Sequence, residues 1–289
     1  MKLYNIAGMI ISIDGYMDKT TLERMSGYEM LPTGDGPDVA VDISLSDSPM
    51  AVPEENSVTV SPNEIWCVRD DMLSYYMCFP DIDGAAVMAD CNIDFTVISI
   101  RLYDVKANLG YDDNCYLFNT LSTMLHYIAL NHERLVFHSS SVCANGEGVA
   151  FSASSGVGKS THTGLWLENI DGSFYINDDT PIIGFSDDRV VISGTPFAGT
   201  SGINTNITVP LRAIVFVTRG DVNSLTRVDT VTAFVRMMSQ LKKPVNDIMS
   251  AKLIATLDRI LGNVPCYLME CNISPEAVFT AYGAVFGND

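Results

Sequence analysis

The chain has 289 residues, of which 47% are hydrophobic and 18% charged, a composition typical of a globular protein with one or two domains. Its formal net charge of −18 argues against anionic partners, namely nucleic acids and anionic lipid membranes. The seven cysteines are scattered without a Cys-x-x-Cys pair, which favours neither a zinc site nor a disulfide framework. With no convincing secretory signal or membrane-spanning run, we expect a cytoplasmic protein.

Residues 1–112 are predicted to form a β-rich N-terminal subdomain. Short apolar runs with strand-like character alternate there with turn-rich linkers that contain proline and glycine. These strands could complete the sheet of the following part or form an interface, and nothing in them indicates a function of their own. Strands are expected at Leu3–Ser12, Val39–Leu45, Ser57–Val60, Glu64–Val68, Ser74–Phe79, Ala85–Ala89 and Phe95–Tyr103.

The second part, residues 113–289, is expected to begin with a helix and a β-hairpin. Apolar residues recur at helical spacing over Tyr116–Leu130. Asn145-Gly146, the commonest two-residue hairpin turn, is predicted to join strands at Leu135–Ala144 and Glu147–Ala153. An α/β unit is therefore expected to follow the β-rich subdomain.

His138 is placed by this hairpin at a point of chemical interest. If Ala144 faces Glu147 across the turn, counting back along both strands puts His138 opposite Ala153, at the mouth of the next motif. The alternative is a hydrogen-bonded structural histidine of a strand. His162, in the helix after that motif, is expected to be solvated or packed rather than catalytic.

The most informative stretch runs from Ala153 to Thr161, Ala-Ser-Ser-Gly-Val-Gly-Lys-Ser-Thr, between a predicted buried strand and a helix expected over Thr161–Asn169. Its glycines allow the backbone N–H groups to turn inward around an anion, and the following helix directs its positive end to the same place. The lysine is then placed to reach terminal phosphates and the serine after it to ligate Mg²⁺. Because Ala153 replaces the first glycine of the usual pattern, a Gly/Ser-rich structural turn is the alternative. The predicted phosphate-binding residues are Ser154, Ser155, Gly156, Val157, Gly158, Lys159, Ser160 and Thr161.

Two adjacent carboxylates, Asp178 and Asp179, follow a strand expected at Ser173–Asn177. One helix connects this strand to the strand before the glycine-rich loop, so the two strands should run parallel and end at one edge of the sheet. One carboxylate could then hold Mg²⁺ together with Ser160, and the other could accept the proton of an attacking hydroxyl. Which carboxylate does which stays open, and an Asx turn before Pro181 is the alternative.

Further strands are expected at Arg189–Ser193 and Ala213–Thr218. The glycine-containing segment Gly194–Asn206 between them is predicted either to fold over a nucleotide, which would exclude water, or to be a plain surface loop. Arg189, Arg212 and Arg219 are candidates for the extra positive charge that phosphoryl transfer needs, with surface solvation as the alternative for each. An arginine from a neighbouring subunit is a further option, so a homo-oligomer stays open.

Three of these features together carry a family resemblance. His138-Ser-Ser-Ser, the Lys159-Ser160 loop and Ile-Asn-Asp178-Asp179-Thr-Pro resemble the HPr kinase/phosphorylase-like group, whose P-loop core is shared with phosphoenolpyruvate carboxykinases. The similarity runs from about Asp113 to the C-terminus. It implies an α/β fold with a mixed-sheet P-loop core, an ATP-type donor, Mg²⁺, an acidic base and a hydroxyl acceptor that is typically a serine. It also implies that His138 contacts the transferred phosphate or orients the acid pair.

The chain departs from that group on the acceptor side. The Glu-Ile-Arg-Gly-Leu-Gly stretch that follows the acid pair in the HPr enzymes is missing, and Gly194–Asn206 stands in its place. Phe197 and Thr200 occupy positions where shorter relatives carry Trp and Lys. HPr itself is therefore not expected as the substrate, and a peptide serine or a small-metabolite hydroxyl is.

The resulting prediction is a cytoplasmic, ATP- and Mg²⁺-dependent P-loop kinase in which Asp178, Asp179 and His138 act on a hydroxyl acceptor. A non-catalytic nucleotide sensor or regulator that keeps the phosphate cradle is the main alternative, favoured by the altered Gly194–Asn206 segment. A phosphorylase that runs the reaction backwards with phosphate or pyrophosphate is a second one. The choice of donor among ATP, GTP and pyrophosphate stays open.

Overall fold

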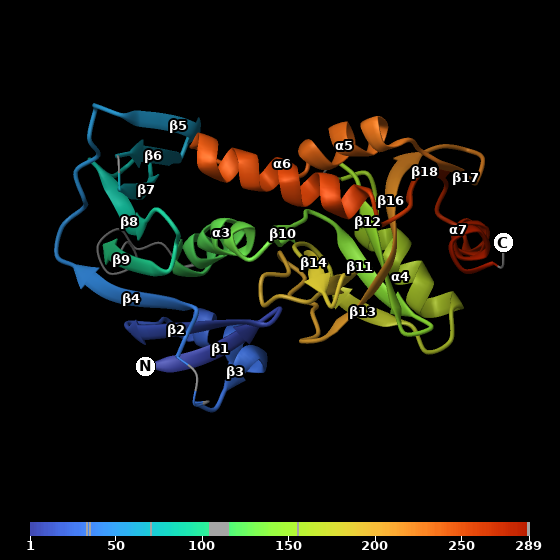
Figure 1. Ribbon diagram of the computed structural model, residues 1–289, viewed down its shortest axis with the longest axis horizontal. Coiled ribbons are helices and arrows are strands. Elements are labelled where there is room, and N and C mark those ends of the chain that lie inside the picture. The colour runs from blue at the N-terminus through green and yellow to red at the C-terminus, as the bar shows by residue number, and fades with distance from the viewer. Residues whose placement is uncertain (33, 35, 70, 104–115, 155, 288–289) are drawn as a thin grey trace. The chain divides into compact units, whose positions relative to one another are not determined.

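The computed structural model describes residues 1–32, 34, 36–69, 71–103, 116–154 and 156–287. This part of the chain is mixed α/β and contains two mixed sheets, as expected at the level of fold class (Figure 1). It divides into two compact units, here called unit 1 (Met1–His132 with Lys243–Ser250) and unit 2 (Glu133–Lys242 with Ala251–Asp289). The boundary predicted between residues 112 and 113 lies outside the described residues, and helix α3 (Tyr116–Asn131) groups with unit 1.

Unit 1 contains a sheet of its own, in the order β3-β1-β2-β4-β9-β8-β7-β6-β5. The strand predicted over Leu3–Ser12 is wrong in extent. Ala7 and Gly8 both adopt positive φ (53° and 83°), and this tight turn splits the run into an antiparallel hairpin. The elements are β1 (Lys2–Ile6), β2 (Met9–Gly15), α1 (Lys19–Met25), η1 (Ser26–Tyr28), β3 (Glu29–Met30), β4 (Val39–Ser46), β5 (Ser57–Ser61), β6 (Glu64–Val68), β7 (Met72–Cys78), β8 (Ala85–Asn92) and β9 (Val97–Tyr103).

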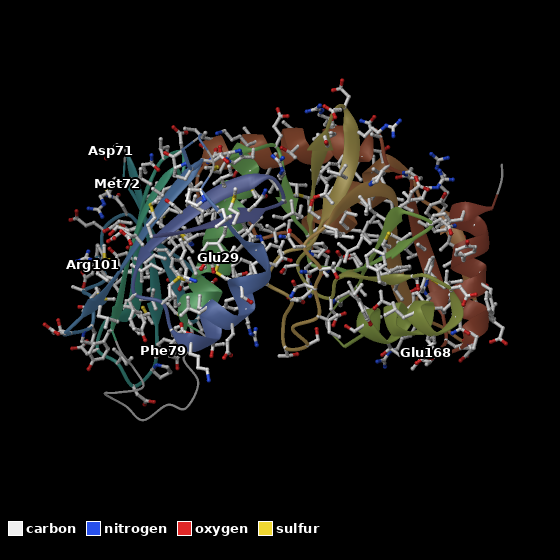
Figure 2. All side chains as sticks on the ribbon, turned by 90° about the horizontal axis from the view of Figure 1, so that it is seen from below. Glu29, Asp71, Met72, Phe79, Arg101 and Glu168 are labelled. Carbon is white, nitrogen blue, oxygen red and sulfur yellow. The ribbon has the colours of Figure 1, made fainter. Side chains whose placement is uncertain are left out.

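Aromatic rings join α3 to the sheet of unit 1. The ring of Tyr127, on α3, stacks on Phe95 with centroids 5.0 Å apart and meets Trp66 edge-on at 4.9 Å. All three side chains are buried, so large apolar surfaces rather than the backbone hold the helix on this sheet. Charged side chains such as Arg101 lie outside this core (Figure 2).

Unit 2 contains the second sheet, in the order β10-β14-β15-β16-β12-β11-β13, with β18 paired to both β16 and β17. Its strands are β10 (Leu135–Val136), β11 (Ser140–Ala144), β12 (Glu147–Ser152), β13 (Phe174–Asn177), β14 (Ile182–Ser186), β15 (Arg189–Ser193), β16 (Thr208–Arg219), β17 (Ser224–Arg227) and β18 (Cys266–Cys271). The helices are α4 (Lys159–Asn169), α5 (Thr230–Met238), α6 (Asp247–Leu261), whose first residues group with unit 1, and α7 (Pro275–Phe286).

Strands β12 and β13 run in the same direction, as the sequence predicted, although they are not neighbours. Strand β11 lies between them and is antiparallel to both. Ser152 and Asn177, the last residues of β12 and β13, therefore lie at the same edge of the sheet. The buried face behind them contains Val149, Phe151 and Trp166, which fix α4 against the sheet.

The predicted strand Leu135–Ala144 is interrupted, which corrects the sequence analysis. Its first residues form β10, which pairs with β14, and β11 begins only at Ser140. In between, the Phe137 and Ser139 N–H groups donate to the carbonyl oxygens of Pro181 and Asp179, both at 2.9 Å. The backbone therefore changes partners at His138, so this residue lies outside the hairpin ladder although Ala144 does pair with Glu147 as predicted.

None of the described helices is both long enough and apolar enough to span a bilayer.

Candidate functional site

The glycine-rich loop connects the end of β12 directly to α4, which begins at Lys159, two residues earlier than predicted. Gly158, the residue before the helix, has φ of 120°, a conformation that favours glycine because a Cβ atom would clash with the backbone. Ser154, Ser160 and Thr161 are exposed, and Ser155 lies outside the described residues. The loop thus presents Ser154, Ser160 and Thr161 to solvent.

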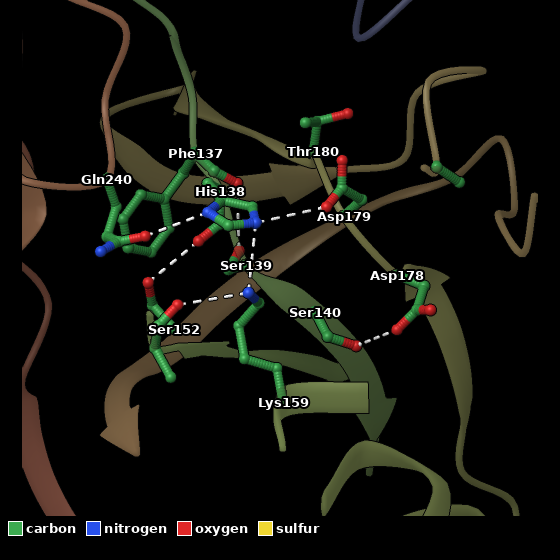
Figure 3. Close-up of polar contacts among 12 residues, drawn as sticks. Phe137, His138, Ser139, Ser140, Ser152, Lys159, Asp178, Asp179, Thr180 and Gln240 are labelled. Carbon is green, nitrogen blue, oxygen red and sulfur yellow. Dashed lines mark hydrogen bonds and ion pairs between the residues drawn. The ribbon is translucent and has the colours of Figure 1, made fainter. Parts of the chain in front are cut away.

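Lys159 is the buried charge of this loop. Only 9% of the residue is exposed, and its ammonium group lies 3.2 Å from the Ala153 carbonyl oxygen and 3.1 Å from His138 Nε2 (Figure 3). Burial lowers the pKa of Lys159, and the negative charges of Asp179 and Asp178 partly offset this shift. The lysine and the twin aspartates therefore act on one another electrostatically.

His138 lies between Lys159 and Asp179. Its Nε2 atom is 3.4 Å from Asp179 Oδ1, and its Nδ1 atom is 3.0 Å from Gln240 Oε1. A carbonyl oxygen of Gln240 only accepts, so Nδ1 carries hydrogen; in the neutral ring Nε2 then accepts from the Lys159 ammonium. Nε2 therefore faces both the Lys159 ammonium and the Asp179 carboxylate.

The backbone of the acid pair is held by a turn that the side chain of Asn177 forms, and not by turns of the aspartates themselves. Asn177 Oδ1 accepts from the N–H groups of Asp179 and Thr180 at 2.8 and 2.7 Å, which is the Asx turn considered in the sequence analysis. It uses the asparagine and leaves both aspartate side chains available. Asn177 Nδ2 in turn donates to the Thr195 carbonyl oxygen at 2.9 Å, so the turn is anchored to the segment after β15.

The two carboxylates have different surroundings. Asp178 is buried, and its Oδ1 accepts from the Ser140 hydroxyl at 2.7 Å; Ser140 Oγ lies 2.8 Å from Thr163 Oγ1. Thr163 Oγ1 also contacts the carbonyl oxygen of Ser160 at 3.2 Å, so this side belongs to the first turn of α4. Asp179 is half-buried and faces His138. The structure therefore separates the adjacent carboxylates into one beside the helix start and one beside the lysine–histidine pair.

The Gly194–Asn206 segment packs against the acid pair. A Cβ atom on Gly199 would lie 3.2 Å from Asp179 Cγ, and Gly199 has φ of 59°. The Asp178 N–H group donates to the Ile203 carbonyl oxygen at 3.1 Å, and Thr180 Oγ1 donates to the carbonyl oxygen of Phe197. Phe197 is buried and Thr200 exposed. The segment is therefore a wall of the site beside Asp179.

Of the three arginines considered, Arg219 alone contacts the loop in the described structure. Its Nε atom donates to the Val157 carbonyl oxygen at 3.0 Å and its Nη2 atom to that of Gly156 at 2.5 Å. Arg212 instead donates to the Val285 carbonyl oxygen, and Arg189 is exposed at the start of β15. Because Arg219 donates to two carbonyl oxygens of the loop, it fixes the backbone of the glycine-rich turn.

His162 is packed, which agrees with the sequence analysis. It is buried against the ring of Phe151, and its Nε2 atom accepts from Trp166 Nε1 at 3.2 Å. Burial lowers its pKa to about 4, so it is a neutral core residue at ordinary pH.

Sequence reasoning missed three residues of the site, Ser140, Thr163 and Gln240. Gln240 is 102 residues from His138, and no local pattern relates the two. Ser140 and Thr163 carried a weak signal, since a hydroxyl on the inner face of a core strand or helix needs a buried polar partner.

The donor set fits Mg²⁺ only as a shared ligand sphere. Among the described residues, no cluster of three or more His, Cys, Asp or Glu side chains is arranged to hold a metal ion. Mg²⁺ binds oxygen and usually takes one or two carboxylates together with substrate phosphates and water. The Asp178 carboxylate is linked through the Ser140 and Thr163 hydroxyls to the carbonyl oxygen of Ser160, so one carboxylate and one serine of the loop lie on adjoining elements, as that pattern requires.

Comparisons with known proteins add little to this geometry. No family model and no curated protein matches the chain. Among solved structures, it is similar to the Hpr(Ser) kinase/phosphatase from Coxiella burnetii with a TM-score of 0.33 and 14% sequence identity, over 52% of this chain and 95% of that chain. The likeness is distant, and the character of the site rests on its own residues.

Proposed function

We propose that the protein is an ATP- and Mg²⁺-dependent kinase that transfers a phosphoryl group to a hydroxyl acceptor, a peptide serine or a small-molecule hydroxyl, in the cytoplasm. One observation carries the proposal. Lys159 Nζ, His138 Nε2 and Asp179 Oδ1 form a continuous row, with contacts of 3.1 and 3.4 Å, where the glycine-rich loop becomes α4. A cation for phosphate and a carboxylate base for a hydroxyl are thus adjacent.

The loop is assigned to the polyphosphate of the nucleotide. Its backbone amides, the positive end of α4 and the Lys159 ammonium provide positive potential at one place. Arg219 keeps the loop in shape through the Gly156 and Val157 carbonyls. The lowered pKa of Lys159 fits this role, because the buried ammonium lacks full solvation until an anion binds.

The two aspartates receive different roles from their different surroundings. Asp179 accepts the proton of the acceptor hydroxyl; the hydroxyl oxygen forms the new bond to the γ-phosphorus, and the bond to the β–γ bridging oxygen breaks as ADP leaves. His138, whose Nε2 atom lies 3.4 Å from Asp179 Oδ1 and 3.1 Å from Lys159 Nζ, orients this carboxylate beside the lysine. Asp178, with the Ser160 hydroxyl, would hold Mg²⁺, whose charge neutralises phosphate oxygens during transfer.

Matched asparagine variants test this assignment. The full chain is incubated with Mg-ATP and candidate serine peptides or hydroxyl metabolites, and ADP and the phosphoester are quantified. We expect Asp179→Asn to lower turnover by about 10²–10⁴-fold with unchanged ATP affinity, as removal of a general base does. Asp178→Asn should instead raise the Mg²⁺ concentration that gives half-maximal turnover.

Two results would contradict the proposal. Full turnover in Asp179→Asn would show that Asp179 is not the general base. Tight ATP binding without turnover on any acceptor would favour a nucleotide sensor. In that case Lys159→Met should abolish the binding of ATP. A control at Asp188, an exposed residue of the β14–β15 turn, should leave both turnover and binding unchanged in Asp188→Asn.

A further inference from the structure

A hollow adjoins the glycine-rich loop on the side of α5. Its volume is about 260 Å³, and it lies between the ends of β12 and β16, which are parallel neighbours, and the C-terminal part of α5. The lining residues are contributed by the loop, by β16 and by the end of α5. Those that matter below are Ser152, Arg219, Arg236 and Gln240.

The hollow is positively charged in a negatively charged protein. The chain has 35 acidic and 17 basic residues, yet the described residues that line the hollow include Arg219 and Arg236 and no aspartate or glutamate. A concave surface of one sign concentrates field lines and attracts ions of opposite charge. Two unneutralised guanidinium groups in one hollow indicate a site for an oxyanion, because the planar fork of arginine matches carboxylate and phosphate oxygens.

Both arginines are held in position without a carboxylate partner among the residues that the structure describes. Arg219 uses two of its N–H groups on the Gly156 and Val157 carbonyl oxygens, and the guanidinium carbon of Arg236 lies 5.8 Å from the centroid of the Phe216 ring. A guanidinium has five N–H groups, so donors are left on each for a ligand. The hydroxyls of Thr218 and Ser239 already donate to backbone carbonyls of Met269 and Arg236, which leaves the arginines as the main donors.

The hollow shares a wall with the row that contains Lys159. Gln240 lines it and contacts His138 Nδ1 at 3.0 Å, and Ser152 lines it and donates to the His138 carbonyl oxygen at 2.9 Å. A ligand bound there would meet the arginines on one side and, on the other, Gln240 and Ser152, the two residues that contact His138. Charge and position together suit a molecule that carries both an anionic group and a reacting group.

We propose that this hollow, which shares Ser154 and Val157 with the glycine-rich loop, is a second oxyanion subsite that binds a carboxylate or phosphate group of the acceptor. The acceptor part of this inference rests on the proposed kinase function. It narrows the acceptor to a hydroxyl compound that also carries an anionic group. Arg236 is the residue that recognises this group, and Arg219 both recognises it and shapes the loop.

Equilibrium titration of the full chain with inorganic phosphate tests the subsite, with the phosphate loop free or saturated with Mg²⁺ and a non-hydrolysable ATP analogue. Phosphate should still bind to the analogue-saturated protein, and Arg236→Gln should weaken this binding by about tenfold or more, because a charged donor is lost. Arg236→Lys should weaken it less. Arg189→Gln, which removes the same charge from an exposed position on β15, should not change it.

Acetate in place of phosphate identifies the chemistry of the group. Binding of acetate that depends on Arg236 assigns a carboxylate, and binding of phosphate alone assigns a phosphate ester. The inference is overturned if the ATP analogue displaces phosphate completely, since the hollow would then be part of the nucleotide site, or if Arg236→Gln and wild type bind phosphate equally. If the analogue itself fails to bind, the proposed function fails, whereas the phosphate titration of the free protein still tests the hollow.

Discussion

The two units of the chain differ in what they bury. In the described part of unit 1 the buried polar residues are serines and threonines, and the largest buried side chains, such as Trp66, Tyr75 and Phe95, are aromatic. In unit 2, Lys159, His162 and Asp178 are also buried. Burying an ionisable group costs free energy unless partners compensate, so a fold that keeps three in one unit has a use for at least some of them.

The position of these groups distinguishes function from packing. Lys159 and Asp178 lie at the edge where β12 and β13 end, and each has polar partners. His162 lies one turn into α4, under Phe151 and beside Trp166, with no partner for Nδ1 among the described residues. Unit 2 is therefore expected to contain two kinds of buried ionisable group. Lys159 and Asp178 serve the chemistry of the site, whereas His162 is a neutral residue of the core.

The largest expected effect concerns His162 and pH. Its pKa falls from 6.5 to about 4 on folding, so the folded state resists protonation that the unfolded state accepts. Stability contributed by the neutral ring is complete above pH 6.5 and is lost as the pH falls towards 4, by about 3 kcal/mol. His162→Gln keeps an acceptor for Trp166 and does not titrate, so this part of the acid sensitivity should disappear.

The free energy of unfolding of unit 2 can be followed separately. Each unit contains one of the two tryptophans, so urea unfolding in a Trp66→Phe background reports on Trp166 and unit 2. Wild type and His162→Gln in this background are compared from pH 7 to pH 4. If the free energies of unfolding of wild type and His162→Gln change in parallel with pH over that range, His162 does not take up a proton on unfolding, and its burial is not the cause of the acid sensitivity.

A smaller effect is expected at the Asp178 side of the site. Ser140→Ala removes the hydroxyl that donates to Asp178, and loss of a hydrogen bond to a charged group costs about 1.5–3 kcal/mol. Because this bond orients the carboxylate assigned to Mg²⁺, the Mg²⁺ concentration for half-maximal turnover should rise by about tenfold, equivalent to about 1.4 kcal/mol. The measurement is a Mg²⁺ titration of turnover together with urea unfolding.

Ser141 provides the matched control. It is the next residue of β11, equally buried, and its hydroxyl donates to the Asn177 carbonyl oxygen at 3.0 Å instead of to a carboxylate. Ser141→Ala should lose about 1 kcal/mol of stability and keep the Mg²⁺ dependence. An equal shift of the Mg²⁺ dependence in both variants would show that general loosening, not the Asp178 contact, is responsible.

The fold and the site were accessible from the sequence to different degrees. The loop, the acid pair and the common edge of β12 and β13 followed from local patterns, because turn chemistry and a strand–helix–strand crossover restrict the geometry. The interruption of the strand at His138 did not follow, since it depends on backbone bonds to Pro181 and Asp179. Gln240 was equally out of reach, because its contact with His138 is formed only by the tertiary fold.

The Gly194–Asn206 segment offers a sharper test of what surrounds Asp179. Gly199→Ala would place a Cβ atom 3.2 Å from Asp179 Cγ, so the carboxylate must be displaced by a few tenths of an ångström and turnover should fall by about tenfold. Gly202→Ala is the matched control, because Gly202 also has positive φ, at 66°, but open space around its Cβ position. Both variants should lose about 1 kcal/mol of stability from backbone strain. Equal turnover in Gly199→Ala and Gly202→Ala would show that the Gly194–Asn206 segment does not act on Asp179.

The smallest expected effect concerns the buried hydroxyl groups of α3 in unit 1. Thr120, buried on α3 in unit 1, has no hydrogen-bond partner for its hydroxyl among the described residues. Thr120→Val replaces this unsatisfied group by a methyl group of similar volume and should stabilise unit 1 by about 1 kcal/mol without changing turnover. Thr123, also buried on α3, does bond to the Tyr75 hydroxyl, so Thr123→Val should destabilise unit 1 by about the same amount. Urea unfolding followed by Trp66 fluorescence in a Trp166→Phe background measures both. If the two valine variants shift stability in the same direction, or if either changes turnover, the buried hydroxyls of unit 1 are more than packing and the contrast between the units fails.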